Sequence, residues 1–381
     1  MKLSKLRLTE YRQPFRVGFH SPQTHRIAAE SLFLELTYEN GCRAYGECAP
    51  RPYVTGESCR TVTAVIQEIA SPVLFDADLE SLDDLVVILK TIEKRCVSEG
   101  GRPFLSALAA IDLALLDALG KHRQVHIADV IGRHPTREVP RSISVPFFPT
   151  DLIEKLFIYL QHFISMDAVK ILMKNDLQEN VQRVAFIRSM VGPQMPIRIE
   201  ANGKWSLQEA LRHIEQLSSF GILSIEEPIR AATPERLHQL RKMIDIDIIL
   251  DESICSLEDA QKMTMSQACD GFNLKLSKCG GLLKLMTIAD LAQENGLKCQ
   301  LGTHVGEGPI LDAAGVYAAA SHPVFYHYEG YSSLLFIDLK QDHERLQGMK
   351  RKPLFQGPGF GVPEENLAPL LGASPALEIK A

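Results

Sequence analysis

The sequence has few of the features that mark nucleic-acid-binding, redox or membrane proteins. Its 381 residues carry a net charge of −6 and no dense block of Lys or Arg, which argues against a nucleic acid partner. The eight cysteines stand singly, without a C-x-x-C pair, which argues against a zinc ribbon or redox motif and predicts free thiols. The longest apolar runs are too short and too polar to span a bilayer, and the N-terminus lacks the apolar segment of a signal peptide. We therefore expect a cytoplasmic protein without a membrane partner.

The first third of the chain combines a strand pattern with helical patterns. Residues 29–50 alternate apolar and polar on both sides of Asn40-Gly41, a two-residue hairpin signal. Helical patterns follow at residues 58–75, 79–97 and 103–122. The last of these is apolar all round, as in a helix buried between two layers. An α+β domain is therefore predicted here.

From about Arg141 the rhythm changes to short apolar strands that alternate with amphipathic helices. Strands are predicted at residues 142–147, 167–172, 196–201, 222–228, 247–253, 271–277, 297–303 and 324–329. A period of about 25 residues, repeated about eight times, is typical of a β/α repeat, and eight parallel strands close into a barrel. The rival, a doubly wound open sheet, usually has a G-x-G-x-x-G first turn, which this sequence lacks.

The predicted fold class is α/β, a modified TIM barrel of the (β/α)7β type with an N-terminal α+β capping domain. The capping domain is expected to span residues 1–125 and the barrel residues 126–344. Residues 351–372 are rich in Gly and Pro and are expected to form an irregular tail that packs against the first domain. Residues 345–381 would thereby complete the capping domain.

Carboxylates stand at the C-terminal ends of three successive predicted strands, where β/α barrels carry their chemistry. They are Glu200, Glu226 and Asp251, flanked on the neighbouring strands by Lys170 and Lys275. Three carboxylates that converge repel one another unless a cation balances them, and an all-oxygen ligand set suits Mg²⁺. Glu227 and Glu252 point the other way by side-chain alternation, so we assign them supporting roles.

Five motifs together make a specific pattern that spans nearly the whole chain. They are AYGECAPRPYVTGES at 44–58, IEEP at 225–228, DES at 251–253, FNLKLSKCGGL at 272–282 and GPGFGV at 357–362. The pattern resembles the enolase superfamily, in particular its mandelate racemase/muconate lactonizing enzyme family. Within that family the sequence resembles the muconate-lactonizing subgroup, which includes dipeptide epimerases and o-succinylbenzoate synthases. The resemblance implies a capped barrel, Mg²⁺ and a small carboxylate substrate, and we expect a homo-oligomer.

The resemblance also implies roles for individual residues. Glu200, Glu226 and Asp251 would hold the metal, although the family usually has Asp where Glu200 stands. Lys275 falls on the catalytic lysine of the sixth strand. On the second strand the family has Lys-x-Lys, and here Lys170 falls on the first lysine and Leu172 on the second. A register shift of two residues would instead make Lys170 the base.

Substrate contacts are expected from the capping loops and from residues that follow barrel strands. The family's specificity loops correspond to residues 16–26 and 50–55. The candidates are His20, Arg26, Arg51, Tyr53, Asn202, His304 and Glu329. Dipeptide epimerases carry Asp-x-Asp at the end of the eighth strand, whereas this chain has Tyr328-Glu329-Gly330, which weakens the dipeptide reading.

The expected chemistry is removal of the proton next to a substrate carboxylate, with Mg²⁺ stabilising the enediolate and a lysine accepting the proton. An elimination or cycloisomerisation needs one base, and Lys275 alone can serve, with Lys170 acting through its charge. A racemase or epimerase of an amino acid derivative or dipeptide needs a second base on the other face. A catalytically silent metal-binding barrel is the third alternative, favoured by Leu172 and Glu200. We favour the one-base reaction because Leu172 has no proton to exchange.

Overall fold

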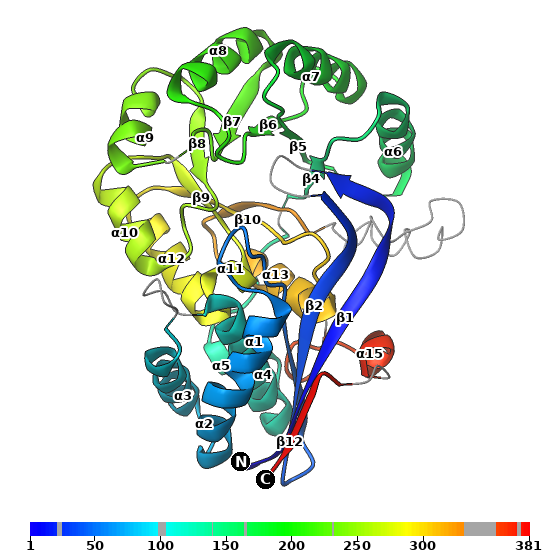
Figure 1. The fold of residues 1–381 in the computed structure, drawn as a ribbon, viewed down its shortest axis with the longest axis vertical. Helices are drawn as coiled ribbons and strands as arrows, with labels where there is room; N and C mark the ends of the chain where they lie inside the picture. Colours follow the sequence, from blue (N-terminus) through cyan, green and yellow to red (C-terminus); the bar gives the residue numbers. More distant parts are fainter. Residues whose placement is uncertain are drawn as a thin grey trace.

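The computed structural model describes residues 1–20, 25–97, 104–138, 140–163, 166–230, 232–330, 356–371 and 375–381. It contains an antiparallel sheet of four strands, in the order β12-β1-β2-β3, and a parallel sheet of eight, in the order β11-β10-β9-β8-β7-β6-β5-β4 (Figure 1). The fold class predicted from the sequence, an α/β barrel with a capping domain completed by the C-terminal tail, is confirmed.

The capping sheet is built on a long hairpin. Its strands are β1 (Leu3–His20), β2 (His25–Tyr38), β3 (Arg43–Cys48) and β12 (Leu377–Lys380). The predicted turn at Asn40-Gly41 joins β2 to β3: Tyr38 N donates to Cys42 O at 2.9 Å, and Gly41 has a φ of +82°. At the other edge β12 pairs with β1 in antiparallel register, so both chain ends lie in one sheet (Figure 1).

Helices of the capping domain pack against this sheet, with α4 lying on β2 and β3. They are α1 (Cys59–Val65), η1 (Ile66–Ala70), α2 (Ser71–Asp76), α3 (Leu82–Arg95), α4 (Leu105–Arg123) and α5 (Ile127–Ile131). Ser58 and Ser81 begin α1 and α3 with capping boxes, in which side chain and backbone satisfy each other's donors. Every residue of α4 from Leu105 to Gly120 is buried, as predicted for a helix between layers. Within the described ranges, no helix has the length and apolar character needed to cross a bilayer.

Each barrel strand lies inside the segment predicted for it. The strands are β4 (Ser142–Val145), β5 (Ala168–Leu172), β6 (Ile197–Glu200), β7 (Ile222–Glu226), β8 (Asp247–Leu250), β9 (Gly271–Leu274), β10 (Lys298–Leu301) and β11 (Phe325–Tyr328). The helices between them are α6 (Thr150–Phe163), α7 (Leu177–Val191), α8 (Leu207–Leu217), η2 (Ser218–Phe220), α9 (Pro234–Arg241), α10 (Leu257–Met265), α11 (Leu276–Cys279), α12 (Leu282–Glu294) and α13 (Pro309–Ser321). A parallel bridge between Arg141 and Tyr328 brings the first and last strands together.

The C-terminal tail departs from the expectation of an irregular segment. It contains helix α15 (Glu364–Leu371) in addition to β12, so that part of the prediction is wrong. Gly and Pro are concentrated before residue 364, and the two glutamates that follow Pro363 suit the first turn of a helix. The domain boundary near residue 344 lies outside the described residues. The domain boundaries therefore stay predictions. The homo-oligomer also stays a prediction, because the structure describes a single chain.

Two buried carboxylates of the capping domain cap helices of the barrel. Glu47 on β3 accepts hydrogen bonds from the backbone N–H groups of Gly308, Ile310 and Leu311 at the start of α13, the last two at 3.1 Å. Asp112 on α4 accepts from Leu282 N at 2.6 Å, the first residue of α12. The first N–H groups of a helix have no acceptor within the helix itself. The capping domain therefore supplies the acceptors that the starts of α12 and α13 need.

We predict that Glu47→Ala lowers the free energy of unfolding by about 2–4 kcal/mol, because it leaves several buried N–H donors unsatisfied. Urea denaturation measures this loss. Ser256→Ala is the matched control, since Ser256 caps the barrel helix α10 from within the barrel, and it should cost only about 1 kcal/mol. Equal losses in the two variants would contradict a special role for Glu47.

Candidate active site

The register of the barrel strands brings the predicted site residues to one level. Leu172 lies opposite Glu200, and Glu200 lies opposite Glu226, so the ends of β5, β6 and β7 are aligned. Asp251 directly follows β8, and Lys275 directly follows β9. The C-terminal ends of five successive strands therefore supply one rim of functional side chains, as β/α barrels do.

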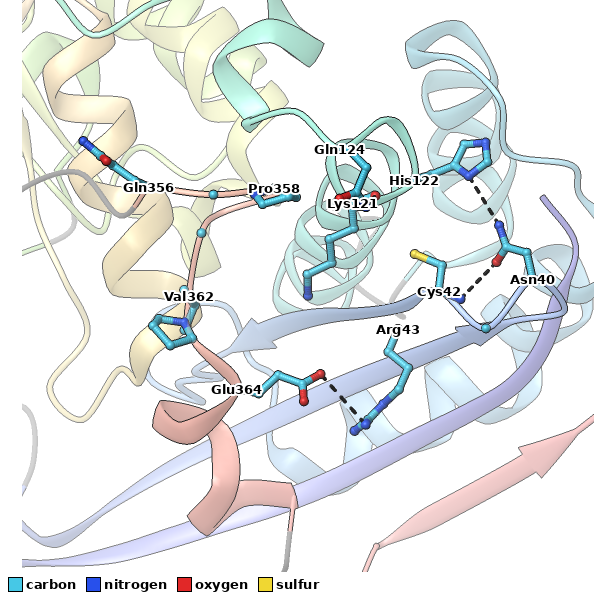
Figure 2. Close-up of a pocket in the computed structure, with 14 residues that line it drawn as sticks. Asn40, Cys42, Arg43, Lys121, His122, Gln124, Gln356, Pro358, Val362 and Glu364 are labelled. Carbon is cyan, nitrogen blue, oxygen red and sulfur yellow. Dashed lines mark hydrogen bonds and ion pairs between the residues drawn. The ribbon is translucent and has the colours of Figure 1, made fainter.

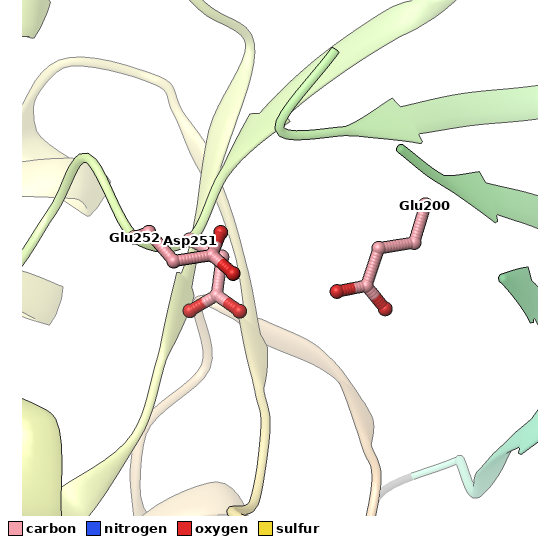
Figure 3. Close-up of side chains that lie close together, drawn as sticks. All are labelled: Glu200, Asp251 and Glu252. Atoms are coloured by element: carbon pink, nitrogen blue, oxygen red, sulfur yellow. The ribbon is translucent and has the colours of Figure 1, made fainter. Parts of the chain in front are cut away.

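Three carboxylates at this rim lie close enough to share a metal ion. Glu200, Asp251 and Glu252 each offer an oxygen, and these atoms lie within 4.8 Å of one another. In Figure 3, Glu200 points from its own strand toward the adjacent Asp251 and Glu252. Oxygens around Mg²⁺ lie up to about 4.2 Å apart at a metal–oxygen distance of about 2.1 Å. Small side-chain adjustments therefore suffice, and the all-oxygen set fits a hard divalent cation.

Glu252 enters this group although side-chain alternation assigned it the opposite direction. The reason is that β8 ends at Leu250, so the alternation of a strand no longer applies two residues later. Glu227 does take a supporting role: its carboxylate accepts from Asp251 N at 2.8 Å and from Ser253 N at 3.3 Å. It thereby fixes the turn that carries Asp251.

Glu226 is held differently from the other predicted metal ligands. Its carboxylate accepts from Lys170 Nζ at 3.1 and 3.2 Å, from Asn273 Nδ2 at 2.7 Å and from Gln300 Nε2. Burial raises its pKa to about 8, and the neighbouring Glu200 adds to this against the opposing charge of Lys170. Its assignment as a metal ligand stays a prediction, with Glu252 as the alternative third carboxylate.

Asp251 is bonded by two lysines. Lys275 Nζ contacts one of its oxygens, and Lys278 Nζ donates to the other at 2.8 Å. Burial disfavours the charged carboxylate, but these two ammonium groups outweigh it and hold the pKa of Asp251 below its usual value. For Lys275, burial likewise disfavours the charge, and Asp251 outweighs it and raises the pKa of the lysine.

Lys170 lies one layer deeper in the barrel, opposite Arg198 of β6. Its ammonium is buried between three carboxylates, with Glu200 at 2.9 Å, Glu226 at 3.1 Å and Glu329 at 3.0 Å. Burial acts against its charge, but these carboxylates raise its pKa well above the usual value. Lys170 is therefore fixed as a cation by the barrel interior.

The position next to Glu200 on β5 is apolar. Leu172 is 3% exposed and occupies the end of β5 beside Glu200, whereas Lys170 reaches Glu200 and Glu226 from one layer below. Lys174, the next lysine along the chain, forms an ion pair with Glu179 at 2.8 Å on the surface. Among the residues that end or directly follow β5 to β9, Lys275 is thus the one lysine.

The predicted substrate contacts fall into several settings. Arg51 is fully buried and donates to the carbonyls of Glu30, Pro50 and Val305, and burial lowers its pKa to about 10. Arg26 pairs with Glu30 at 3.4 Å. Tyr53 is 43% exposed.

Three of the remaining candidates, Asn202, Glu329 and His304, lie at the barrel. Asn202 donates to Glu200 and, at 3.4 Å, to Glu252. Glu329 accepts from Lys170 and from Arg198, at 3.0 and 2.7 Å. His304 is 4% exposed and follows β10. The side chain of His20 lies outside what the structure describes.

Four polar residues of the site were missed in the sequence: Arg198, Asn273, Lys278 and Gln300. Arg198 and Gln300 point into the barrel and join Glu226 to Glu329, since Arg198 donates to both Gln300 and Glu329. Lys278 holds Asp251. Period-two alternation back from Glu200 signals the inward direction of Arg198, but a single polar residue inside an apolar strand gives no hint of its partners.

A separate cavity of about 670 Å³ lies in the capping domain, between the β2–β3 turn, the end of α4 and the tail (Figure 2). Its lining includes Asn40, Cys42, Arg43, Lys121, His122 and Glu364, several of which already pair with one another or with neighbours. No rim residue lines it, so it is distinct from the candidate active site.

Comparison with known proteins shows the family of this chain. Residues 160–364 match the enolase C-terminal domain-like family, and residues 4–132 match the mandelate racemase/muconate lactonizing enzyme N-terminal domain. The chain belongs to the mandelate racemase/muconate lactonizing enzyme family of the enolase superfamily.

The relatives carry out more than one reaction. The chain is 26% identical to the N-succinyl-L-Arg/Lys racemase of Bacillus cereus over 95% of both chains, and the crystal structure of that protein matches with a TM-score of 0.85 over the whole of both chains. It is 28% identical to muconate cycloisomerase 1 of Rhodococcus opacus over 90% of this chain and 91% of that one. A dipeptide epimerase of Enterococcus faecalis, solved with Mg and the dipeptide L-Leu-L-Tyr, matches with a TM-score of 0.80 and 23% identity over 88% of this chain and 91% of that one.

We predict that Asp251→Asn weakens Mg²⁺ binding on the order of tenfold or more, because it removes a charged ligand from the centre of the cluster. Isothermal calorimetry measures the affinity. Asp247→Asn is the control, since Asp247 lies at the opposite end of the same strand and only pairs with Lys298 at the surface. Unchanged affinity in Asp251→Asn would show that the metal binds elsewhere.

The same measurement on Glu226→Gln and Glu252→Gln identifies the third carboxylate. A loss confined to Glu226→Gln supports the ligand set predicted from the sequence. A loss confined to Glu252→Gln supports the set that the structure brings together.

Proposed function

We propose that this chain removes the proton next to the carboxylate of a small substrate and completes an elimination or cycloisomerisation, with Lys275 as its single base. The observation that carries the proposal is the pairing of a buried leucine with a fixed lysine on β5. Leu172 stands at the rim position, and Lys170 is bound by Glu200, Glu226 and Glu329.

Each residue of the site has a separate role in the proposed reaction. The C–H bond of the substrate breaks as Lys275 Nζ, in its neutral amine form, takes the proton. A divalent cation on Asp251 would replace Lys275 as the counter-charge of that carboxylate and so favour the neutral amine. Lys170 contributes positive charge beside the reacting carboxylate without exchanging a proton. Mg²⁺, which the E. faecalis epimerase structure contains, would neutralise the negative charge that develops on the substrate.

Epimerisation is the second candidate function, and the relatives favour it. Racemases and epimerases of amino acid derivatives and dipeptides stand among the relatives beside the muconate cycloisomerase. This reaction needs a second base on the opposite face of the substrate. Lys170 would have to leave its three carboxylates to provide it.

We predict that Lys275→Ala lowers exchange of the substrate α-proton with deuterium by about a hundredfold or more, as expected for a lost general base. Exchange should persist weakly in Lys170→Met, because that variant removes charge but not the base. Proton NMR in D₂O with Mg²⁺ measures both rates. Lys174→Ala is the control, since Lys174 pairs only at the surface. Exchange lost in Lys170→Met but kept in Lys275→Ala would place the base on β5.

A second variant tests the role of the leucine. We predict that Leu172→Lys gains inversion at the α-carbon, because it places an amine at the end of β5, beside Glu200 and across the eight-stranded barrel from Lys275 at the end of β9. Chiral chromatography of the recovered substrate measures the inverted isomer. Leu172→Met keeps the apolar wall and should show no gain. Inversion by the native protein at a rate equal to that of Leu172→Lys would favour the epimerase.

A further inference from the structure

His304 stands at the mouth of the barrel beside the proposed base. Leu301, the last residue of β10, lies opposite Leu274, the last residue of β9, so the segments that carry His304 and Lys275 leave the sheet at the same level. The imidazole is 4% exposed, and the charged groups that act on it most strongly include Lys275 and Arg51. The ring is therefore shielded from solvent and lies in the electrostatic field of the proposed base.

The capping domain fixes the ring and its tautomer. His304 Nδ1 lies 3.0 Å from the carbonyl oxygen of Ala49, which follows β3, and because a carbonyl only accepts, Nδ1 carries the proton. The neighbouring backbone is tied to the same domain: Arg51 donates to Val305 O at 2.7 Å, and Ser31 Oγ donates to Gly306 O at 3.1 Å. The ring is thus held from the capping side, with Nε2 directed away from that contact.

Nε2 is left as a bare acceptor. It is buried and has no hydrogen-bond partner in the part of the chain that the structure describes. Burial, reinforced by the charges of Lys275 and Arg51, lowers the pKa of His304 well below its usual value, so the ring is neutral. A buried acceptor without a partner destabilises the protein, and a bound ligand removes that cost if it brings a donor.

We infer that His304 Nε2 accepts a hydrogen bond from an N–H or O–H group of the substrate, close to the carbon that loses its proton to Lys275. The inference rests on the proposed function and narrows its substrate class. An N-acyl amino acid or a hydroxy acid carries such a donor, whereas an unsaturated diacid offers only acceptors. His304 is then the residue that selects for the donor.

Two matched pairs of ligands test this with the Mg²⁺-loaded protein. N-acetylalanine is compared with N-acetyl-N-methylalanine, and 3-hydroxybutanoate with 3-methoxybutanoate, so that each pair differs in the donor. Calorimetry gives the dissociation constants, and NMR in D₂O gives α-proton exchange. The native protein should prefer the donor-bearing member of one pair by about tenfold or more, and that pair identifies the donor as N–H or O–H.

The variants separate recognition from structure. His304→Phe keeps a ring without an acceptor and should weaken only the donor-bearing ligand, which abolishes the preference. His304→Gln keeps an acceptor and should retain part of it. Ser31→Ala removes the hydrogen bond from Ser31 Oγ to Gly306 O, which also joins the capping domain to the segment after β10, and should leave the preference unchanged.

Three results would overturn the inference: equal weakening of both members of a pair in His304→Phe, no preference in the native protein, or no measurable binding of any of the four ligands. Failure of the proposed function looks different. Binding preference without exchange would reject α-proton removal and keep the role of His304, whereas exchange without preference would reject the role of His304 alone.

Discussion

The compensation of buried charge is the constraint on which the rest of this structure depends. The barrel mouth and the layer below it hold buried carboxylates, among them Glu200, Glu226, Asp251 and Glu329, and buried or nearly buried cations, among them Lys170, Arg198, Lys275 and Lys278. Removing one partner of such a pair typically costs about 3–5 kcal/mol, since it leaves an uncompensated charge in a poorly solvated place. The network therefore dictates which side chains are free to act. Lys170 shares three carboxylates, while Lys275 is held by one.

The capping domain positions the residues on the substrate side of the barrel through buried polar contacts. Glu47 satisfies the start of α13, and Arg51 and Ala49 hold the segment that carries His304. These contacts mean that the shape of the site is set jointly by both domains. A change in the capping loops therefore alters recognition without touching the rim of carboxylates, which fits a family whose members share a fold and differ in substrate.

Much of the fold was predictable because strand and helix periods are local signals. All eight barrel strands fall within their predicted segments, and strand ends led to Glu200, Asp251 and Lys275. The misses have a common cause, which is that local patterns do not report what happens after an element ends or between distant elements. Glu252 joined the cluster because β8 stops at Leu250, and α15 formed where composition suggested an irregular tail. The partners of Arg198 come from three other strands or their ends, so no sequence spacing reveals them.

The central claim is that one base acts on one face of the substrate. The stereochemical course of exchange tests it most directly: an enantiopure, accepted substrate is incubated with the native Mg²⁺-loaded protein in D₂O, and the unreacted fraction is recovered. The account predicts deuterium at the α-carbon with the original configuration retained, because Lys275 returns the isotope to the face from which it took the proton. Accumulation of the mirror-image form, or an α-proton that persists at full intensity, would contradict it.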